Sequence, residues 1–363
     1  MKIGIVLHPY GEKKQTGLGE YIFELAKCLI ESDKENEYVI FLKSGFDETP
    51  VFNGSNWQVK VLSWGNLWRD LGLFFAPRMD LYIFNTPMMP LFFKPGKSIV
   101  IALDFAYKYF SGDSLREKIN NNILFWLNKI SLWRADLIIS ISTATKDDIL
   151  KFFGNKLDKK IKVIYPGFRN LSNFLEEKIE IVKPYFLFVG SIKQRKNVLN
   201  IVKAFDDFRR KHESDHKLVL VGKKSGAYYQ EISDFIREKA LEKEIIFMDY
   251  VKDENLVYLY KNAEAFIFPS MIEGFGFPIL EAMSCNAPVI TSNVSSVAEV
   301  AGDSAILVDP LNILEISEAM HQIVSDKKLR DDLIARGNER IKDFSWEKTT
   351  KEFLRIIKEI KRV

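Results

Sequence analysis

Two glutamates, Glu273 and Glu281, stand eight positions apart on either side of a glycine-rich stretch in residues 268–284, which read FPSMIEGFGFPILEAMS. A short apolar run ends just before this stretch. Pro278 suits the first helical position, where its missing N–H group would be unpaired in any case. The pattern predicts a strand, a glycine turn and a helix with Glu281 in its first turn. Because ligands of open α/β sheets bind at the carboxyl ends of strands, and helix starts favour anions, we expect a binding site here.

The two carboxylates fit hydroxyl groups better than phosphates. Beside an anion site Glu281 would repel a phosphate, but it can accept two hydrogen bonds from a vicinal diol such as that of a ribose. Charge-assisted hydrogen bonds of this kind contribute roughly 1.5–3 kcal/mol each. Glu273 could bind the hydroxyl groups of a second polyol, such as a sugar. Gly274 and Gly276 would let the backbone approach that ligand closely. Spacing alone leaves open that either glutamate is an ordinary surface acid.

Arg195 and Lys196 add positive charge after another apolar run, residues 185–191. A guanidinium grips phosphate oxygens as a fork and a lysine adds a point charge, so the pair could neutralise a diphosphate without a metal. A solvated basic loop is the alternative. The familiar phosphate-binding motifs are absent, because the sequence has no complete G-x-G-x-x-G, no Walker A loop and no Asp-x-Asp. We therefore favour a nucleoside diphosphate held by side-chain cations.

Two series of short apolar, β-branched runs alternate with segments of helical spacing. Such runs indicate strands that are buried on both faces, hence parallel sheets, and the alternation indicates βαβ units. The sequence therefore predicts an α/β protein of two Rossmann-like domains, over 1–170 and 171–344, with a final helix over 345–363. The expected strands lie at 2–8, 38–44, 57–63, 80–86, 98–104, 136–142 and 161–167, and then at 185–191, 217–223, 244–250, 265–270, 287–292 and 305–310.

Composition narrows the class of protein. The 363 residues are 47% hydrophobic, which is enough for the cores of two domains. A net charge of +3 without a basic stripe argues against nucleic-acid binding. Cys28, Cys285 and the four histidines show no metal-ligand spacing, so we expect no metal site and a reducing compartment. With no signal-peptide pattern and no apolar run of ~18 residues, we expect a cytoplasmic protein.

These motifs resemble the E-x7-E signature of retaining glycosyltransferases of family four. The resemblance covers nearly the whole chain and includes EGFGFPILEAM, FVGSIKQRKN, LVLVGKK and FSWEKTTKEFL, together with TGLGEYIFELAKCL near the start. It implies the GT-B fold, in which two Rossmann-like domains face each other across a cleft and a C-terminal helix crosses back to the N-terminal domain.

The resemblance also implies roles for individual residues. Arg195 and Lys196 would bind the donor diphosphate, Glu281 would hold the ribose hydroxyls, and Glu273 would contact the transferred sugar near its reacting carbon. The backbone around them would touch the donor as well, through the amides of Gly274, Phe275, Gly276 and Phe277, through Gly190 and Ser191 lining the cleft, and through Gly17 of the N-terminal domain.

One position departs from the family pattern. Relatives often carry His-Asp after the strand expected at 98–104, where this chain has Leu103 followed by Asp104. Asp104 would remain to orient the sugar or the acceptor. The loss of the histidine leaves two functions open. One is transfer with a different donor or acceptor, and the other is a protein that binds a nucleotide sugar with weak or no transferase activity.

The form of the motifs is most similar to bacterial mannosyltransferases of polysaccharide assembly. The resemblance implies a metal-independent, retaining hexosyltransferase without a cofactor, which takes a nucleotide-diphosphate sugar, GDP-mannose first, and a glycan or lipid-linked glycan acceptor. Epimerases and phosphorylases share the architecture but are disfavoured, because the former lack this E-x7-E placement and the latter need a pyridoxal lysine in a longer chain.

The acceptor should meet the N-terminal half, where many aromatic residues gather. Segment 116–134 could lie against a membrane with its basic residues near anionic lipid, which would make the protein peripheral on the inner face. We favour instead an ordinary amphipathic core helix. The aromatic residues concerned are Trp64, Trp68, Phe74, Phe75, Phe92, Phe93, Trp126 and Trp133.

Overall fold

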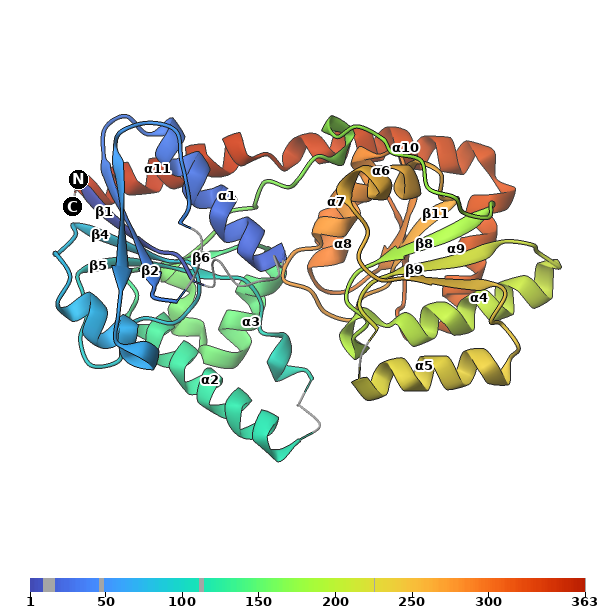
Figure 1. Ribbon diagram of the computed structural model, residues 1–363, viewed down its shortest axis with the longest axis horizontal. Helices are drawn as coiled ribbons and strands as arrows, with labels where there is room; N and C mark the ends of the chain where they lie inside the picture. Colours follow the sequence, from blue (N-terminus) through green and yellow to red (C-terminus); the bar gives the residue numbers. More distant parts are fainter. Residues whose placement is uncertain (9–16, 46–48, 111–113, 225, 363) are drawn as a thin grey trace. The chain divides into compact units, whose positions relative to one another are not determined.

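The computed structural model describes residues 1–8, 17–45, 49–110, 114–224 and 226–362. It divides into two compact units, one of residues 1–167 with 344–363, the other of residues 168–343 (Figure 1). The sequence places these boundaries after residues 170 and 344.

The N-terminal unit contains a seven-stranded sheet in the order β3-β2-β1-β4-β5-β6-β7, with every neighbouring pair parallel. The apolar runs form these strands because both faces of the sheet are covered, so that Ile99, Val100, Ile101 and Ala102 are fully buried. The strands are β1 (Lys2–Val6), β2 (Glu37–Lys43), β3 (Trp57–Leu62), β4 (Leu81–Phe84), β5 (Lys97–Ala102), β6 (Leu137–Ser140) and β7 (Ile161–Val163). The helices are α1 (Gly17–Ser32), α2 (Leu115–Arg134), α3 (Thr143–Phe153) and α11 (Trp346–Arg362).

The C-terminal unit contains a six-stranded parallel sheet in the order β10-β9-β8-β11-β12-β13. The order reverses between β8 and β11, and such a switch point is where α/β sheets of this kind bind ligands. The strands are β8 (Tyr185–Val189), β9 (Lys217–Val221), β10 (Ile245–Met248), β11 (Ala265–Phe268), β12 (Val289–Ser292) and β13 (Ile306–Val308). The helices are α4 (Val198–His212), α5 (Gly226–Glu238), α6 (Asp253–Lys261), α7 (Phe277–Ser284), α8 (Ser295–Ala301), α9 (Ile313–Ser325) and α10 (Lys327–Arg340).

The last helix, α11, belongs to the N-terminal unit, as the resemblance to family four implies. It buries Phe353, Ile356 and Ile357, and the ring centroid of Trp346 lies 5.7 Å from that of Tyr21 on α1. The chain returns through a tight contact, because a Cβ atom on Gly167 would lie 2.3 Å from the backbone N of Trp346. Only glycine fits at this position without displacing the start of α11.

Helix α2 contradicts the expectation of an ordinary core helix. Of its 20 residues it buries only Asn128, Ser131 and Leu132, and its larger apolar side chains Ile123 and Trp126 are 53% and 57% exposed. Its first turn is fixed locally by a capping box, in which Ser114 and Glu117 each bond the other's backbone N–H. The helix is therefore well defined although the side chains of one apolar face are largely exposed.

Candidate functional site

Arg195, Lys196 and Glu273 meet at the carboxyl ends of two neighbouring strands. Arg195 and Lys196 form a 3-10 turn (Gln194–Lys196) after β8, and Glu273 lies in the bend after β11. The two loops are joined through their backbones, because the N–H of Met271 donates to the carbonyl oxygen of Arg195 at 2.8 Å. The strand order thus brings together residues that are 77 and 78 positions apart in the sequence.

Glu273 is bonded to both cations. Arg195 Nη1 donates to Glu273 Oε2 at 2.8 Å, and Lys196 Nζ forms an ion pair with Glu273 Oε1. The side chains of Glu273 and Lys196 are each 9% exposed, while that of Arg195 is 24% exposed. Lys196 Nζ also lies 4.6 Å from the centroid of the Phe268 ring. One carboxylate for two cations leaves the cluster with a net positive charge, which suits an anionic ligand.

The carboxyl group of Glu273 stays ionised in this setting. Burial alone would raise its pKa, but the charges and hydrogen bonds of Lys196 and Arg195 outweigh burial and hold the pKa below its ordinary value. The sequence placed a sugar contact at Glu273 and a diphosphate contact at the two cations. It gave no signal that the three side chains would pair with one another.

Two serines fix the backbone of Glu273. Ser295 Oγ accepts a hydrogen bond from the Glu273 N–H at 3.1 Å and donates to its carbonyl oxygen at 3.0 Å. Ser296 Oγ donates to the same carbonyl oxygen at 2.8 Å. Both serines begin α8, directly after β12, so a third strand end supports the bend. Sequence reasoning missed them, although serines after a strand next to the site are a signal for such support.

The glycine bend has the backbone conformation that the sequence suggests. Gly276 has a φ of 120°, and a Cβ atom there would lie 3.1 Å from Val297 Cγ1. Phe275 is buried, with its ring centroid 5.1 Å from that of Phe277. Helix α7 begins at Phe277, so Pro278 is its second residue and Glu281 its fifth. The prediction that Glu281 lies in the first helical turn is therefore wrong.

Glu281 is not the surface acid that its spacing left open. Its side chain is 12% exposed and lies 3.4 Å from Arg169 Nη2, while Arg169 Nη1 holds Asp253 at 2.8 Å. Tyr260 lies fully buried beside it, and burial together with the charge of Glu281 raises the pKa of the phenol well above its ordinary value. Arg169 lies next to the predicted domain boundary after residue 170, where nothing in the sequence marked it as a partner of Glu281.

Gly190 and Ser191 follow β8. Gly190 donates its N–H to the carbonyl oxygen of Val221 at 2.9 Å, and Ser191 next to it is exposed. The end of β9 approaches closely, because a Cβ atom on Gly222 would lie 1.9 Å from the carbonyl oxygen of Gly190. The chain at Gly190 and Gly222 is therefore packed backbone against backbone.

The remaining predicted residues belong to the N-terminal unit. Gly17 is the first residue of α1. Asp104 follows β5, is exposed, and accepts the backbone N–H of Ala106 at 3.1 Å. Leu103 turns its carbonyl oxygen toward Thr145, whose Oγ1 donates to it at 3.2 Å. Within the described ranges, no group of three or more His, Cys, Asp or Glu side chains could hold a metal ion.

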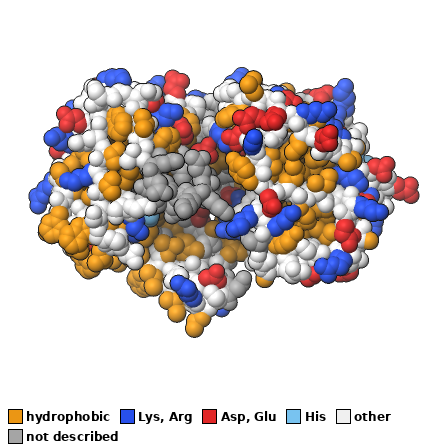
Figure 2. Space-filling model, viewed as in Figure 1, with side chains coloured by type: hydrophobic (Ala, Val, Ile, Leu, Met, Phe, Trp, Pro, Cys, Tyr) orange, Lys and Arg blue, Asp and Glu red, His pale blue; other side chains and the backbone are white. Residues whose placement is uncertain are grey.

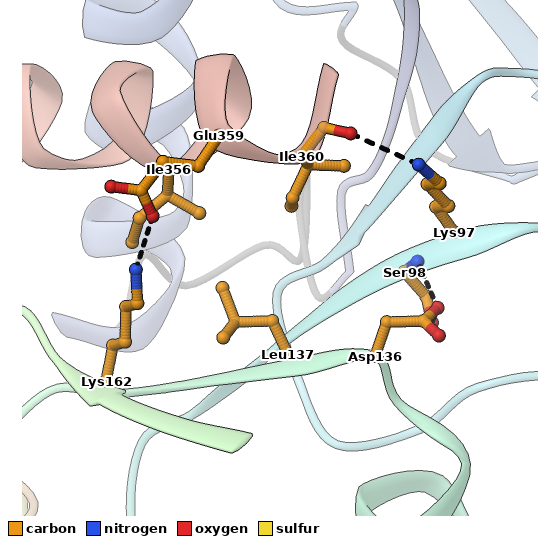
Figure 3. A pocket seen from close by; sticks show the side chains of 8 residues that line it. All are labelled: Lys97, Ser98, Asp136, Leu137, Lys162, Ile356, Glu359 and Ile360. Atoms are coloured by element: carbon orange, nitrogen blue, oxygen red, sulfur yellow. Dashed lines mark hydrogen bonds and ion pairs between the residues drawn. The ribbon is translucent and has the colours of Figure 1, made fainter. Parts of the chain in front are cut away.

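A separate pocket of about 340 Å³ lies in the N-terminal unit, at the amino ends of β5, β6 and β7 and beneath α11 (Figure 3). Its two lysines are already engaged, Lys97 with the carbonyl oxygen of Ile360 at 3.1 Å and Lys162 with Glu359 at 2.7 Å. The amino ends of parallel strands are not where α/β sheets of this kind bind ligands. We therefore place the functional site not at this pocket but at the carboxyl ends of β8 and β11 in the C-terminal sheet.

The chain is similar to known proteins in sequence and in fold. Residues 173–340 match the family model described as "Glycosyl transferases group 1". The O-antigen chain mannosyltransferase B of Escherichia coli is 31% identical over 239 residues, which cover 63% of this chain and 62% of that protein. The match thus spans less than two thirds of the curated relative.

Solved structures share the fold over nearly the whole chain. Sucrose-phosphate synthase from Thermosynechococcus elongatus has a TM-score of 0.77 at 18% identity, covering 99% of this chain and 98% of that one. The Anabaena protein Alr3699/HepE in complex with UDP-glucose has a TM-score of 0.70 at 16% identity, covering 99% and 100%. At these identities the likeness shows the fold alone, which is the expected two-domain GT-B fold. The match to the glycosyl transferases group 1 model lies within the C-terminal unit.

Proposed function

We propose that the chain is a retaining hexosyltransferase. It moves a mannosyl group from a nucleoside diphosphate sugar, GDP-mannose first, to a hydroxyl group of a glycan or lipid-linked glycan on the cytoplasmic side of a membrane. The observation that carries the proposal is the cluster of Arg195, Lys196 and Glu273 at the switch point of the C-terminal sheet. The mannosyltransferase named above supports the choice of sugar.

The chemistry follows from where charge develops. As the bond between the anomeric carbon and the diphosphate oxygen breaks, its electron pair moves to the diphosphate and positive charge grows on the sugar ring. Arg195 and Lys196 stabilise the departing diphosphate, because they already lie in a largely buried setting that needs little reorganisation. The acceptor hydroxyl attacks from the face that the diphosphate leaves, and its proton passes to the leaving phosphate oxygen. The configuration at the anomeric carbon is thereby retained.

The two glutamates have different tasks. Glu281, oriented by Arg169, accepts hydrogen bonds from the ribose hydroxyls. Glu273 holds the two cations in place and presents an oxygen to a sugar hydroxyl, while Ser295 and Ser296 keep its backbone fixed. The amides of residues 274–277 complete the contacts to the sugar and phosphates. The N-terminal unit, with Asp104, meets the acceptor.

No metal is required in this scheme, since the side-chain cations supply the positive charge that a divalent ion gives elsewhere. We expect transfer to continue in the presence of a chelator. Loss of activity with EDTA and its recovery with Mg²⁺ or Mn²⁺ would contradict this part of the proposal.

The direct test is a thermal-shift panel of GDP-, UDP- and ADP-sugars, followed by transfer assays with the sugar that stabilises the protein. We expect GDP-mannose to raise the Tm clearly and Lys196→Ala to remove most of the shift. Glu315→Gln, which changes a residue in the first turn of α9 away from the cluster, is the control and should keep the shift. A panel in which no nucleotide sugar raises the Tm would refute the proposal.

A second function is favoured by Leu103. A protein of the same fold could bind a nucleotide sugar without transferring it, because the family's usual histidine at this position is missing. A thermal shift with a nucleotide sugar but no hydrolysis or transfer over a panel of acceptors would favour that function. Activity gained by Leu103→His would show what the substitution removed.

A further inference from the structure

Helix α2 presents a stripe of large apolar side chains outward. The stripe consists of residues spaced three or four apart, which places them on one face of the helix. An ordinary helix of a globular unit turns such a face toward the core. The members of the α2 stripe and their exposed fractions are Leu115 (76%), Ile119 (51%), Ile123 (53%), Trp126 (57%), Ile130 (39%) and Trp133 (42%).

Polar contacts on the inner side fix this orientation. Asn128 Nδ2 donates to the phenol oxygen of Tyr107 at 2.9 Å, and Ser131 Oγ accepts the backbone N–H of Met89 at 2.9 Å. Both residues are buried, and Leu132 is buried beside them. Rotating the helix to hide its stripe would break these hydrogen bonds and bury unpaired polar groups. The outward apolar face is therefore a specified feature of the unit.

Basic residues accompany the stripe. The helix carries Arg116, Lys118, Lys129 and Arg134 against a single acid, and Lys129 Nζ lies 4.9 Å from the centroid of the Trp126 ring. The single acid, Glu117, is engaged in the capping box. At the lower end of the view in Figure 2, where Figure 1 places α2, hydrophobic side chains reach the surface next to basic ones.

The same charge preference extends over the whole N-terminal unit. Residues 1–167 and 344–363 contain 28 Lys and Arg against 21 Asp and Glu, whereas residues 168–343 contain 24 against 28. The positive charge of the chain is thus concentrated in the unit that exposes the stripe.

A second apolar patch adjoins the carboxyl end of α2. Its exposed members are Trp64, Phe74, Phe75 and Phe92, and the ring centroids of Trp64 and Phe75 lie 5.7 Å apart. Arg134 at the end of α2 donates to the carbonyl oxygen of Leu91 at 2.9 Å, which ties the segment before Phe92 to the helix. The apolar surface therefore continues beyond α2.

We propose that the α2 stripe docks on an anionic lipid bilayer, with α2 lying in the plane of the interface. Tryptophan and isoleucine enter the region between headgroups and acyl chains, and the lysines and arginines reach anionic headgroups. Charge complementarity favours lipid over a second copy of this chain, which would bring basic surface against basic surface. Among the residues that the structure describes, no helix is long and apolar enough to cross a bilayer. This inference concerns the surface of the N-terminal unit and holds whether or not the chain transfers mannose.

Vesicle flotation tests the proposal directly. We expect the wild-type protein to float with vesicles of phosphatidylglycerol and phosphatidylcholine at low salt, and to float weakly with phosphatidylcholine alone. Replacing Ile119 and Ile123 together by Gln should lower partitioning at least about tenfold, since both side chains are more than half exposed and their loss leaves the core intact. Replacing Arg116 and Lys118 together by Gln should lower it by about tenfold or more at low salt and less at high salt.

The matched control is Leu311→Gln with Leu314→Gln, two side chains of the C-terminal unit that are 68% and 59% exposed. Partitioning of this control should equal that of the wild type. Undiminished flotation of the Ile119 and Ile123 variant, or no flotation of the wild type, would overturn the proposal. A change from dimer to monomer in that variant, seen by sedimentation without vesicles, would assign the stripe to a second copy instead. Thermal shifts with nucleotide sugars should be the same in all these variants, so failure here is distinguishable from failure of the proposed function.

Discussion

Replacing Glu273 by Gln separates the structural task of this carboxylate from its task toward a donor. The substitution keeps the shape of the side chain and removes the negative charge shared by Arg195 and Lys196. Breaking a buried ion pair from one side costs about 3–5 kcal/mol. Because Arg195 is 24% exposed and water can solvate part of its charge, we expect a smaller loss of about 2–3 kcal/mol in the free energy of unfolding.

The loss should be visible as a lower melting temperature. For a domain of the size of residues 168–343, each kcal/mol shifts the Tm by roughly 2–4 °C, so the expected drop is about 4–12 °C. Differential scanning calorimetry of the ligand-free protein measures it. The control is Asp303→Asn, whose side chain is 83% exposed and whose ion pair with Arg336 should be worth less than about 1 kcal/mol.

Nucleotide should partly reverse the loss. In the variant a diphosphate becomes the main counter-charge for Arg195 and Lys196, so saturating GDP should raise the Tm by more than it does in the wild type. Transfer of the sugar should nevertheless fall, because the contact to its hydroxyl is weakened. A ligand-free Tm within about 1 °C of the wild type, or a smaller GDP shift in the variant, would refute the assigned pairing.

The same ion pairs predict a dependence on pH. Although burial opposes it, the charges of Lys196 and Arg195 lower the pKa of Glu273 in the folded protein. The stability that they give is therefore fully present above the unfolded-state pKa of about 4.3, and is lost as the pH falls through the lower pKa of the folded state. The difference in unfolding free energy between wild type and Glu273→Gln should be constant from about pH 6 to 8 and shrink below about pH 4. A difference that grows on acidification would contradict the sign of the shift.

Further outcomes follow from the surroundings of the cluster. Glu281→Ala should weaken nucleotide binding about 10- to 100-fold in calorimetric titration, because one charge-assisted hydrogen-bond acceptor for the ribose is lost; an unchanged Kd would remove Glu281 from the site. Arg169→Gln should weaken nucleotide binding by a smaller factor, about three- to tenfold, since it acts only by orienting Glu281; a larger loss than that of Glu281→Ala would mean that Arg169 contacts the nucleotide itself. Gly222→Ala should lower the Tm clearly and reduce soluble yield, because its Cβ would lie 1.9 Å from the carbonyl oxygen of Gly190; an unaltered Tm would show that the strand ends can separate.

The strands could be predicted from the sequence because most are short runs dominated by apolar, β-branched residues. Every run that the pattern indicates corresponds to a strand in the structure, from Lys2–Val6 to Ile306–Val308. Burial on both faces leaves no competing helical periodicity, so run length and β-branching decide the assignment. The sequence also placed Arg195 and Glu273 after strands in the same half of the chain, but it did not indicate that their side chains would pair.

What the sequence did not reveal depends on partners that are distant along the chain. Arg169 lies 112 positions from Glu281, and no periodicity relates the two. The exact start of α7 also escaped prediction, since Phe277 and Pro278 are both compatible with a first helical position. Helix α2 illustrates this limit. Its helical periodicity was clear from the sequence, but whether its apolar face points to the core or to solvent was not. Apolar spacing tells which side chains share a face, and only buried groups such as Asn128 and Ser131 tell which way that face points.

Because α11 packs on α1, the N-terminal unit is completed only after the intervening segment 168–343 has been synthesised. During synthesis, the apolar surface that Phe353, Ile356 and Ile357 cover in the folded unit stays exposed to solvent. It can be covered only after the whole segment 168–343 and α11 have emerged from the ribosome. A stop codon before Phe344 would spare the contiguous C-terminal unit and leave the N-terminal one with an open groove. A truncation that removes α11 should therefore appear as misfolding of the N-terminal unit.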